Sequence, residues 1–249
     1  MSASQTISGH SDKQGVGPEE MTELAAKAGL FGFLGRCLEA EPDGALLDLI
    51  RGPMRDGLEQ SGVQFSEQFL ETSSDRLLRA LGEEFTCLFV APGSISPYAS
   101  VFETGLIFQE PADRALAAYK LGGMQFQPVH SGEFPDHAGI MLSFYAHLLG
   151  REDALLKANK LDKAANFKTL RHDFMLKEAG TWLPGWCKRA REYAMHEFYD
   201  QILSLAEAVI WDEVQTIATR QQLRELSAQN QREPVKLDYD ADFRKASGL

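Results

Sequence analysis

The chain has 249 residues, of which 44% are hydrophobic and 10% aromatic, the composition of a folded globular protein. Its 36 acidic residues outnumber its 25 basic residues, so the net charge is −11. Such a charge repels nucleic-acid phosphates and excludes a nucleic-acid partner, whereas it favours encounter with a basic partner through long-range steering.

The cysteines and the N-terminal segment indicate where the protein works. Cys37, Cys87 and Cys187 lie far apart and form no C-x-x-C pair, so we expect three small, buried, reduced residues. Residues 1–17 contain no apolar core of a secretory leader. No segment approaches the roughly 20 apolar residues of a membrane span. These features predict a soluble cytoplasmic protein without a membrane span.

Apolar residues recur at the helical period along almost the whole chain. Helices are predicted, in chain order, over Pro18–Glu39, from Asp43, from Pro53, from Thr72 to Phe89, from Pro111 to Gly122, from Pro135 to Gly150, up to Glu178, from Pro184, and over a long final stretch that contains Phe198 and Ile210. The fold class is therefore all-α.

The helices are expected to form a single helical-bundle-like domain over residues 18–226, with irregular loops between Ala91 and Phe134. Residues 123–134 are a candidate hinge, which leaves both a monomer and a domain-swapped dimer open. Residues 1–17 are expected to be a disordered N-terminal segment, and residues 227–249 a flexible C-terminal tail.

The run Glu133-Phe134-Pro135-Asp136-His137 is the most informative motif. Pro135 suits the first position of a helix, and Asp136 in the first turn would complement the helix dipole. Earlier in the chain, the loop Pro97-Tyr98-Ala99-Ser100 offers a rigid turn, an aromatic ring and a hydroxyl. If the two loops meet, they form a cleft with an apolar floor and an acidic rim, which suits arginines followed by apolar residues. Alternatively, Tyr98 only packs beneath a loop.

Enzymatic patterns are weaker. His130, Glu133 and His137 lack the histidine pair one helical turn apart that zinc proteases use, and neither a G-x-S-x-G elbow nor a P-loop is present. The His172-Asp173 dipeptide, with His137 before it and Asp200 or Asp212 after it, is similar to the metal-binding pattern of all-α phosphohydrolases, although adjacent helical residues point apart. No catalytic residue, metal or cofactor is predicted, and a metal-dependent phosphohydrolase is the alternative.

Three blocks, in order, resemble the TorD/DmsD family of molybdoenzyme-specific chaperones. They are Glu84-Phe85-Thr86-Cys87-Leu88-Phe89 with Pro92-Gly93 and Pro97-Tyr98-Ala99-Ser100, then Glu133-x-Pro135-Asp136-His137, then Trp182-Leu183-Pro184 with Phe198-Tyr199. The chain departs from the family's usual residues at Met141, Glu178 and Cys87, which bears on the identity of the client.

The resemblance implies a cytoplasmic chaperone, not an enzyme. Its expected partners are the apo catalytic subunit of an exported molybdoenzyme and the twin-arginine leader of that subunit, which it holds until molybdopterin cofactor insertion. Glu133 and Asp136 would engage the leader's arginines, His137 and Tyr98 its backbone or apolar part. The expected peptide-binding residues are Glu133, Pro135, Asp136, His137, Pro97, Tyr98 and Ser100.

Overall fold

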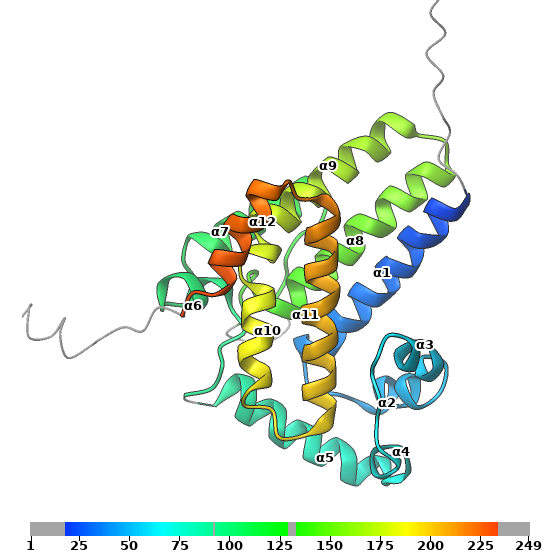
Figure 1. Cartoon of the computed structure of the whole chain (residues 1–249), viewed down its shortest axis with the longest axis vertical. Helices are drawn as coiled ribbons and strands as arrows, with labels where there is room; N and C mark the ends of the chain where they lie inside the picture. The colour runs from blue at the N-terminus through cyan, green and yellow to red at the C-terminus, as the bar shows by residue number, and fades with distance from the viewer. Residues whose placement is uncertain (1–17, 92, 129–132, 234–249) are drawn as a thin grey trace, which may run out of the picture.

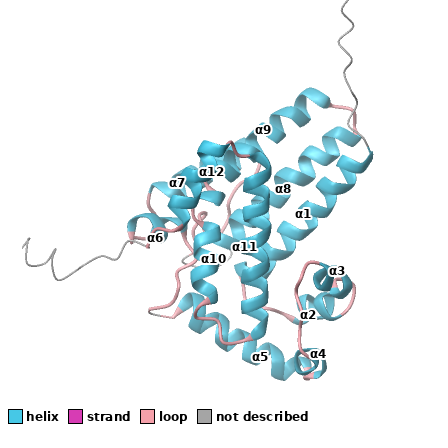
Figure 2. Cartoon of the chain, viewed as in Figure 1, coloured by secondary structure: helices cyan, strands magenta, loops and turns pink. Residues whose placement is uncertain are grey.

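The computed structural model describes residues 18–91, 93–128 and 133–233. These residues form helices and loops without a β-strand, which confirms the all-α prediction (Figure 2). Their buried apolar side chains form one cluster that extends from Leu24 to Leu226, so the described residues make a single domain around one core. No helix in the described ranges is long and apolar enough to cross a membrane.

Twelve α-helices are described, with one π-helical segment and one 3₁₀ turn between them. They are α1 (Pro18–Glu39), α2 (Gly44–Arg51), α3 (Arg55–Gln60), α4 (Glu67–Glu71), α5 (Ser74–Phe85), the π-helical segment Thr86–Val90, α6 (Ala99–Thr104), α7 (Glu110–Leu121), α8 (Ala138–Lys157), α9 (Leu161–Lys177), the 3₁₀ turn Ala179–Thr181, α10 (Leu183–Arg191), α11 (Glu197–Ile217) and α12 (Arg220–Asn230).

Helices α1, α8 and α9 lie side by side, and α10 pairs with α11 next to them (Figure 1). Two glycines bring α1 and α8 into backbone contact. A Cβ atom on Gly139 would lie 2.6 Å from the Cα of Glu39, and one on Gly35 would lie 2.9 Å from the carbonyl oxygen of Gly139. The end of α1 is therefore held against the start of α8, next to the run Glu133–His137 that precedes this helix.

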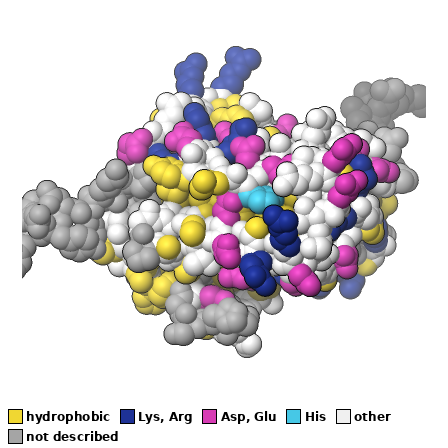
Figure 3. Space-filling view, turned by 90° about the horizontal axis from the view of Figure 1, so that it is seen from below, with side chains coloured by type: hydrophobic (Ala, Val, Ile, Leu, Met, Phe, Trp, Pro, Cys, Tyr) yellow, Lys and Arg dark blue, Asp and Glu magenta, His cyan; other side chains and the backbone are white. Residues whose placement is uncertain are grey.

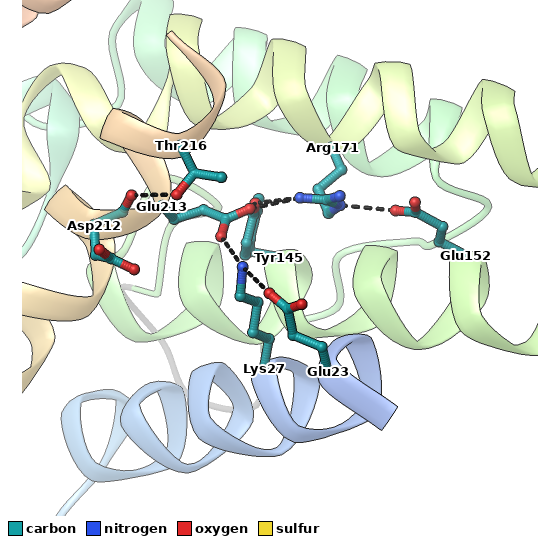
Figure 4. A network of polar contacts seen from close by, with 8 residues as sticks. All are labelled: Glu23, Lys27, Tyr145, Glu152, Arg171, Asp212, Glu213 and Thr216. Atoms are coloured by element: carbon teal, nitrogen blue, oxygen red, sulfur yellow. Dashed lines mark hydrogen bonds and ion pairs between the residues drawn. The ribbon is translucent and has the colours of Figure 1, made fainter. Parts of the chain in front are cut away.

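A buried ion network ties the four helices α1, α8, α9 and α11 together (Figure 4). Arg171 of α9 donates from Nε to Glu152 of α8 at 2.8 Å and from Nη1 to Glu213 of α11 at 2.6 Å. Glu213 also accepts from the hydroxyl of Tyr145 at 2.6 Å and from Nζ of Lys27 of α1 at 3.0 Å. Buried charges persist in a core because each has partners of opposite sign, as here.

Two sequence expectations are wrong. Gly150 does not end a helix, because α8 continues to Lys157 and buries Leu155 in its last turns. Cys37 and Cys187 are buried, but Cys87 is exposed on the π-helical segment. The predicted long helix with Phe198 and Ile210 is α11, and a capping box at Thr219 starts a further helix, α12, after it.

The predicted segment boundaries are only partly visible. Helix α12 runs to Asn230 and so passes the expected start of the tail at 227. Residues 1–17 and 234–249 lie outside the described residues, as do residues 129–132 of the predicted hinge. The surface seen from below in Figure 3 carries acidic side chains scattered among hydrophobic ones, in keeping with the net charge of −11.

Candidate functional site

The two motif loops, whose meeting the sequence left open, do meet in the structure. Tyr98 and His137 form an isolated antiparallel β-bridge. The N–H of Ala138 donates to the carbonyl of Pro97 at 2.8 Å, and the N–H of Ala99 donates to the carbonyl of Asp136 at 3.1 Å. These bonds fix the start of α6 beside the start of α8, so both loops face one site.

The predicted helix start at Pro135 is wrong, and with it the place of Asp136 in a first helical turn. Helix α8 begins at Ala138 with His137 as its N-cap, and Pro135 and Asp136 form a turn before it. The hydroxyl of Tyr119 donates to the carbonyl of Pro135 at 2.5 Å and anchors this turn to α7. The hydrogen bonds of this turn direct Asp136 into the protein, toward α6.

Asp136 caps α6 from outside that helix. Its Oδ2 accepts from the N–H of Ser100 at 2.7 Å, which satisfies a donor that the first turn of a helix leaves unpaired. Asp136 and Ser100 are both fully buried, and Oδ1 of Asp136 has no hydrogen-bond partner in the described part of the chain. The expectation that Asp136 lies on the exposed acidic rim is therefore wrong, because its carboxylate stabilises the junction of the loops from within.

His137 is buried and uncharged at neutral pH. Burial lowers its pKa to about 4, against the opposing charge of Glu133. Its Nδ1 accepts from the N–H of Gly139 at 3.2 Å, so the ring proton is on Nε2. A neutral imidazole with Nε2–H offers one hydrogen-bond donor to a ligand.

Tyr98 lies half-buried between the two loops. Its ring centroid lies 5.7 Å from that of Phe134 and 5.1 Å from that of His137, both in edge-on arrangements. Burial raises its pKa, and the carboxylates of Asp136 and Glu133 raise it further. The neighbourhood of the Tyr98 hydroxyl is thus electrically negative.

Two surface cavities adjoin the bridge and share the side chains of Glu39, Glu133 and Ile140, which makes them one groove. The first, about 270 Å³, is also lined by Phe85, Phe89, Val90, Pro97, Tyr98 and His137. The second, about 190 Å³, is also lined by Tyr119, Met124, Gln125, Phe126, Gln127, Ser143 and Phe144. Two carboxylates therefore lie where the cavities join, and apolar side chains lie on either side. Below, this groove is called the bridge groove.

Beside the bridge groove, the chain exposes a strip of three consecutive apolar residues. Leu106, Ile107 and Phe108 are 43%, 54% and 58% exposed. The ring of Phe108 lies 5.4 Å from that of Phe134, which in turn contacts Tyr98. The backbone of Phe108 has φ of 55°, a left-handed conformation that a bulky residue rarely adopts. Periodicity did not reveal this apolar strip, because it belongs to no helix.

The other motif blocks support the site from beneath. Trp186 of α10 donates from Nε1 to the carbonyl of Ser96 at 2.9 Å and stacks on Phe89. Tyr199 of α11 packs edge-on against Phe89 and donates from its hydroxyl to the carbonyl of Leu81 at 2.9 Å. Trp186, two residues beyond the Trp182-Leu183-Pro184 block, thus holds the residue before Pro97, and Tyr199 of the third block packs on Phe89 of the first.

The residues of the alternative hydrolase do not come together. Asp173 lies on the exposed face of α9 and pairs with Lys177 at 3.0 Å, and Asp200 pairs with Arg191 at 2.7 Å. Within the described residues, no group of three or more His, Cys, Asp or Glu side chains is placed to hold a metal ion. His130 lies outside the described ranges.

Comparison with known proteins adds the family. The family model described as "Nitrate reductase delta subunit" matches residues 53–188. The chaperone protein TorD of Vibrio vulnificus strain YJ016 is 32% identical over 132 residues, which cover 51% of this chain and 60% of the relative. That of Vibrio cholerae strain N16961 is 29% identical over 136 residues, covering 52% and 59%. The match thus spans about 60% of the length of these relatives. No solved structure matches the chain significantly.

Proposed function

Because the chain belongs to the TorD/DmsD family, which the nitrate reductase delta subunit model describes, we propose that it is a chaperone for an exported molybdoenzyme. It binds the apo catalytic subunit and its twin-arginine leader in the cytoplasm and holds them until the molybdopterin cofactor is inserted. It does so by binding, without catalysing a reaction. The bridge groove carries this proposal, because it joins carboxylates to apolar walls.

The groove matches the chemistry of such a leader. Glu133 lies where the two cavities join and accepts a guanidinium group, which suits a carboxylate through bidentate hydrogen bonds. His137 and Tyr98 line the adjoining cavity and contact the peptide backbone. Asp136, Ser100, Pro97 and Pro135 are buried and act by holding the two loops together. The expected set of site residues thus divides into contacting and positioning residues.

The apolar strip extends the groove toward the apolar part of the leader. Contiguous exposed apolar side chains mark interaction surfaces when they adjoin a cleft. At Phe108 the chain also tolerates a strained backbone while leaving the ring 58% exposed. Strain of this kind costs of the order of 1–3 kcal/mol and collects at functional sites. We assign Leu106, Ile107 and Phe108 to contact with the client.

Calorimetric titration tests the proposal. Twin-arginine leader peptides of molybdoenzymes are titrated into the full chain, alongside the same peptides with both arginines replaced by alanine. We expect binding of the native peptides and at least a tenfold loss for the alanine forms, which is about 1.4 kcal/mol. Glu133→Gln is expected to weaken binding, whereas Glu71→Gln, an exposed carboxylate outside the groove, is not. Absence of binding of every such leader at high micromolar concentration contradicts the proposal.

A further inference from the structure

Glu39 is a carboxylate that the sequence motifs do not include. It is the last residue of α1 and is exposed, and a negative charge at this end of a helix is opposed by the helix dipole. Its Oε2 accepts from the hydroxyl of Ser143 of α8 at 3.3 Å, and its backbone is held against Gly139. Within the described residues no basic side chain forms an ion pair with it. The carboxylate of Glu39, which the helix dipole disfavours, is thus held in position by Ser143 and by the contact of its backbone with Gly139.

That place is the middle of the bridge groove. Glu39 and Glu133 are the acidic residues that line both cavities, and neither cavity is lined by a lysine or arginine among the described residues. To one side lie Phe85, Phe89 and Val90, and to the other Phe126 and Phe144. A ligand that fills the groove therefore has positive charge at its middle and apolar groups next to that charge.

Burial and the negative charges around the groove raise the pKa values of two tyrosines beside it. Burial raises the pKa of Tyr119, and the charges of Asp136 and Glu39 raise it further. On the other side of the groove, burial raises the pKa of Tyr98 most, and the charges of Asp136 and Glu133 raise it further. Asp136 is fully buried and cannot contact a ligand in this conformation, but its charge adds to the potential that a bound cation experiences.

We propose that Glu39 and Glu133 together receive the two neighbouring arginines of the client's leader, one carboxylate for each guanidinium, with the apolar residues of the leader in the flanking cavities. The proposal rests on the proposed function and adds to it the second arginine-binding residue, on α1. Two carboxylates, one at the end of α1 and one in the loop before α8, discriminate a pair of arginines from a single one, because a single guanidinium would contact only one of them.

Glu39→Gln tests this inference, with Glu41→Gln as the matched control. Both substitutions remove one negative charge from the same stretch of chain, but Glu41 does not line the groove. We expect Glu39→Gln to weaken leader binding about tenfold at low salt, and the loss to shrink as salt screens the ion pair. Glu41→Gln is expected to change binding less than twofold. The variant should fold normally, since it removes a charge that the helix end disfavours.

Peptide variants identify the contact. With wild-type protein, replacing either leader arginine by glutamine should weaken binding. With Glu39→Gln, one of these two replacements should have almost no further effect, because its partner is already gone. If wild-type protein binds the leader but Glu39→Gln binds as tightly, or if both replacements remain fully additive, the inference about Glu39 is wrong and the chaperone proposal stands. If wild-type protein binds no leader, both fall.

Discussion

The carboxylate Oδ2 of Asp136 lies 2.7 Å from the backbone nitrogen of Ser100, and both residues are fully buried. The motif aspartate therefore acts first as a helix cap between two loops that are distant in sequence. This separates its structural effect from its electrostatic effect on a ligand. An amide at position 136 retains an oxygen that can accept from Ser100, whereas alanine does not.

We expect Asp136→Ala to lower the free energy of unfolding by about 1–2 kcal/mol, the cost of losing a helix cap. Asp136→Asn is expected to lower it by less than half as much. Urea denaturation followed by circular dichroism measures both. Leader affinity, measured in parallel, should fall for both variants, since each removes the buried charge. Equal destabilisation by alanine and asparagine would contradict the capping role.

The pKa of His137 makes stability depend on pH. The folded-state value of about 4 lies below the usual value near 6.5, so the unfolded chain takes up the proton first as pH falls. The contribution of neutral His137 is complete above about pH 6.5 and is lost progressively between pH 6.5 and 4, by about 3 kcal/mol in total. His137→Asn can still cap α8 but does not titrate. Unfolding free energies measured from pH 7 to pH 4 should therefore fall less steeply in His137→Asn than in wild type.

Because of the buried ion network, replacing Arg171 should lower the free energy of unfolding far more than replacing the exposed Arg55. Arg171→Met leaves the buried carboxylates of Glu152 and Glu213 without their shared cation, and should cost about 3–5 kcal/mol. Arg55→Met breaks an exposed pair with Glu59 and should cost at most about 0.5 kcal/mol. Urea denaturation compares the two. Similar losses in the two variants would show that the network does not stabilise the four-helix contact.

Two glycines of α8 should respond to alanine in opposite directions. At Gly150 no atom lies within 4 Å of the added Cβ, so Gly150→Ala should stabilise the helix by about 0.5–1 kcal/mol. At Gly139 the Cβ would meet the backbone of Glu39 at 2.6 Å, and Gly139→Ala should destabilise by roughly 1–3 kcal/mol. Thermal unfolding resolves the sign of each. Because Gly139→Ala displaces Glu39, it should also weaken leader binding.

Phe108→Gly distinguishes function from stability in the apolar strip. Glycine adopts φ of 55° without strain, so the variant should be as stable as wild type or more stable. It also removes an exposed ring, so leader affinity should fall severalfold. Met195→Ser, at a side chain that is 94% exposed and lies in neither cavity of the groove, is the control and should leave affinity unchanged. Unaltered affinity in Phe108→Gly removes Phe108 from the binding surface.

Most of the helices follow from the sequence, because apolar periodicity and breaker residues are local signals. The sequence raises the meeting of the two motif loops only as a possibility, because it is a contact between distant segments. The inward turn of Asp136 does not follow. Pro135 has the properties of a first helical residue, but the bond from Tyr119 to Pro135 and the bond from Ser100 to Asp136 hold both residues in a turn and leave His137 as the cap. These partners come from other elements, and no local pattern contains them.

Tertiary packing also explains the remaining differences. Gly150 carries a local stop signal, but burial of the residues beyond it continues α8. Glu39 enters the groove only because Gly35 and Gly139 allow α1 to touch α8. Its position at a helix end, where a negative charge is disfavoured, is the one local sign that it serves another purpose.

The bridge between Tyr98 and His137 joins the two ends of the segment 99–136, which contains α6 and α7. The backbone hydrogen bonds donated by Ala99 and Ala138 join the two ends of this segment at the edge of the groove. If these two hydrogen bonds break together, both amides become exposed in the same event, so their hydrogen-exchange rates should be correlated. We expect a peptide bound in the groove to slow the exchange of both amides, and with them the opening of α6 and α7, even where it does not contact these helices.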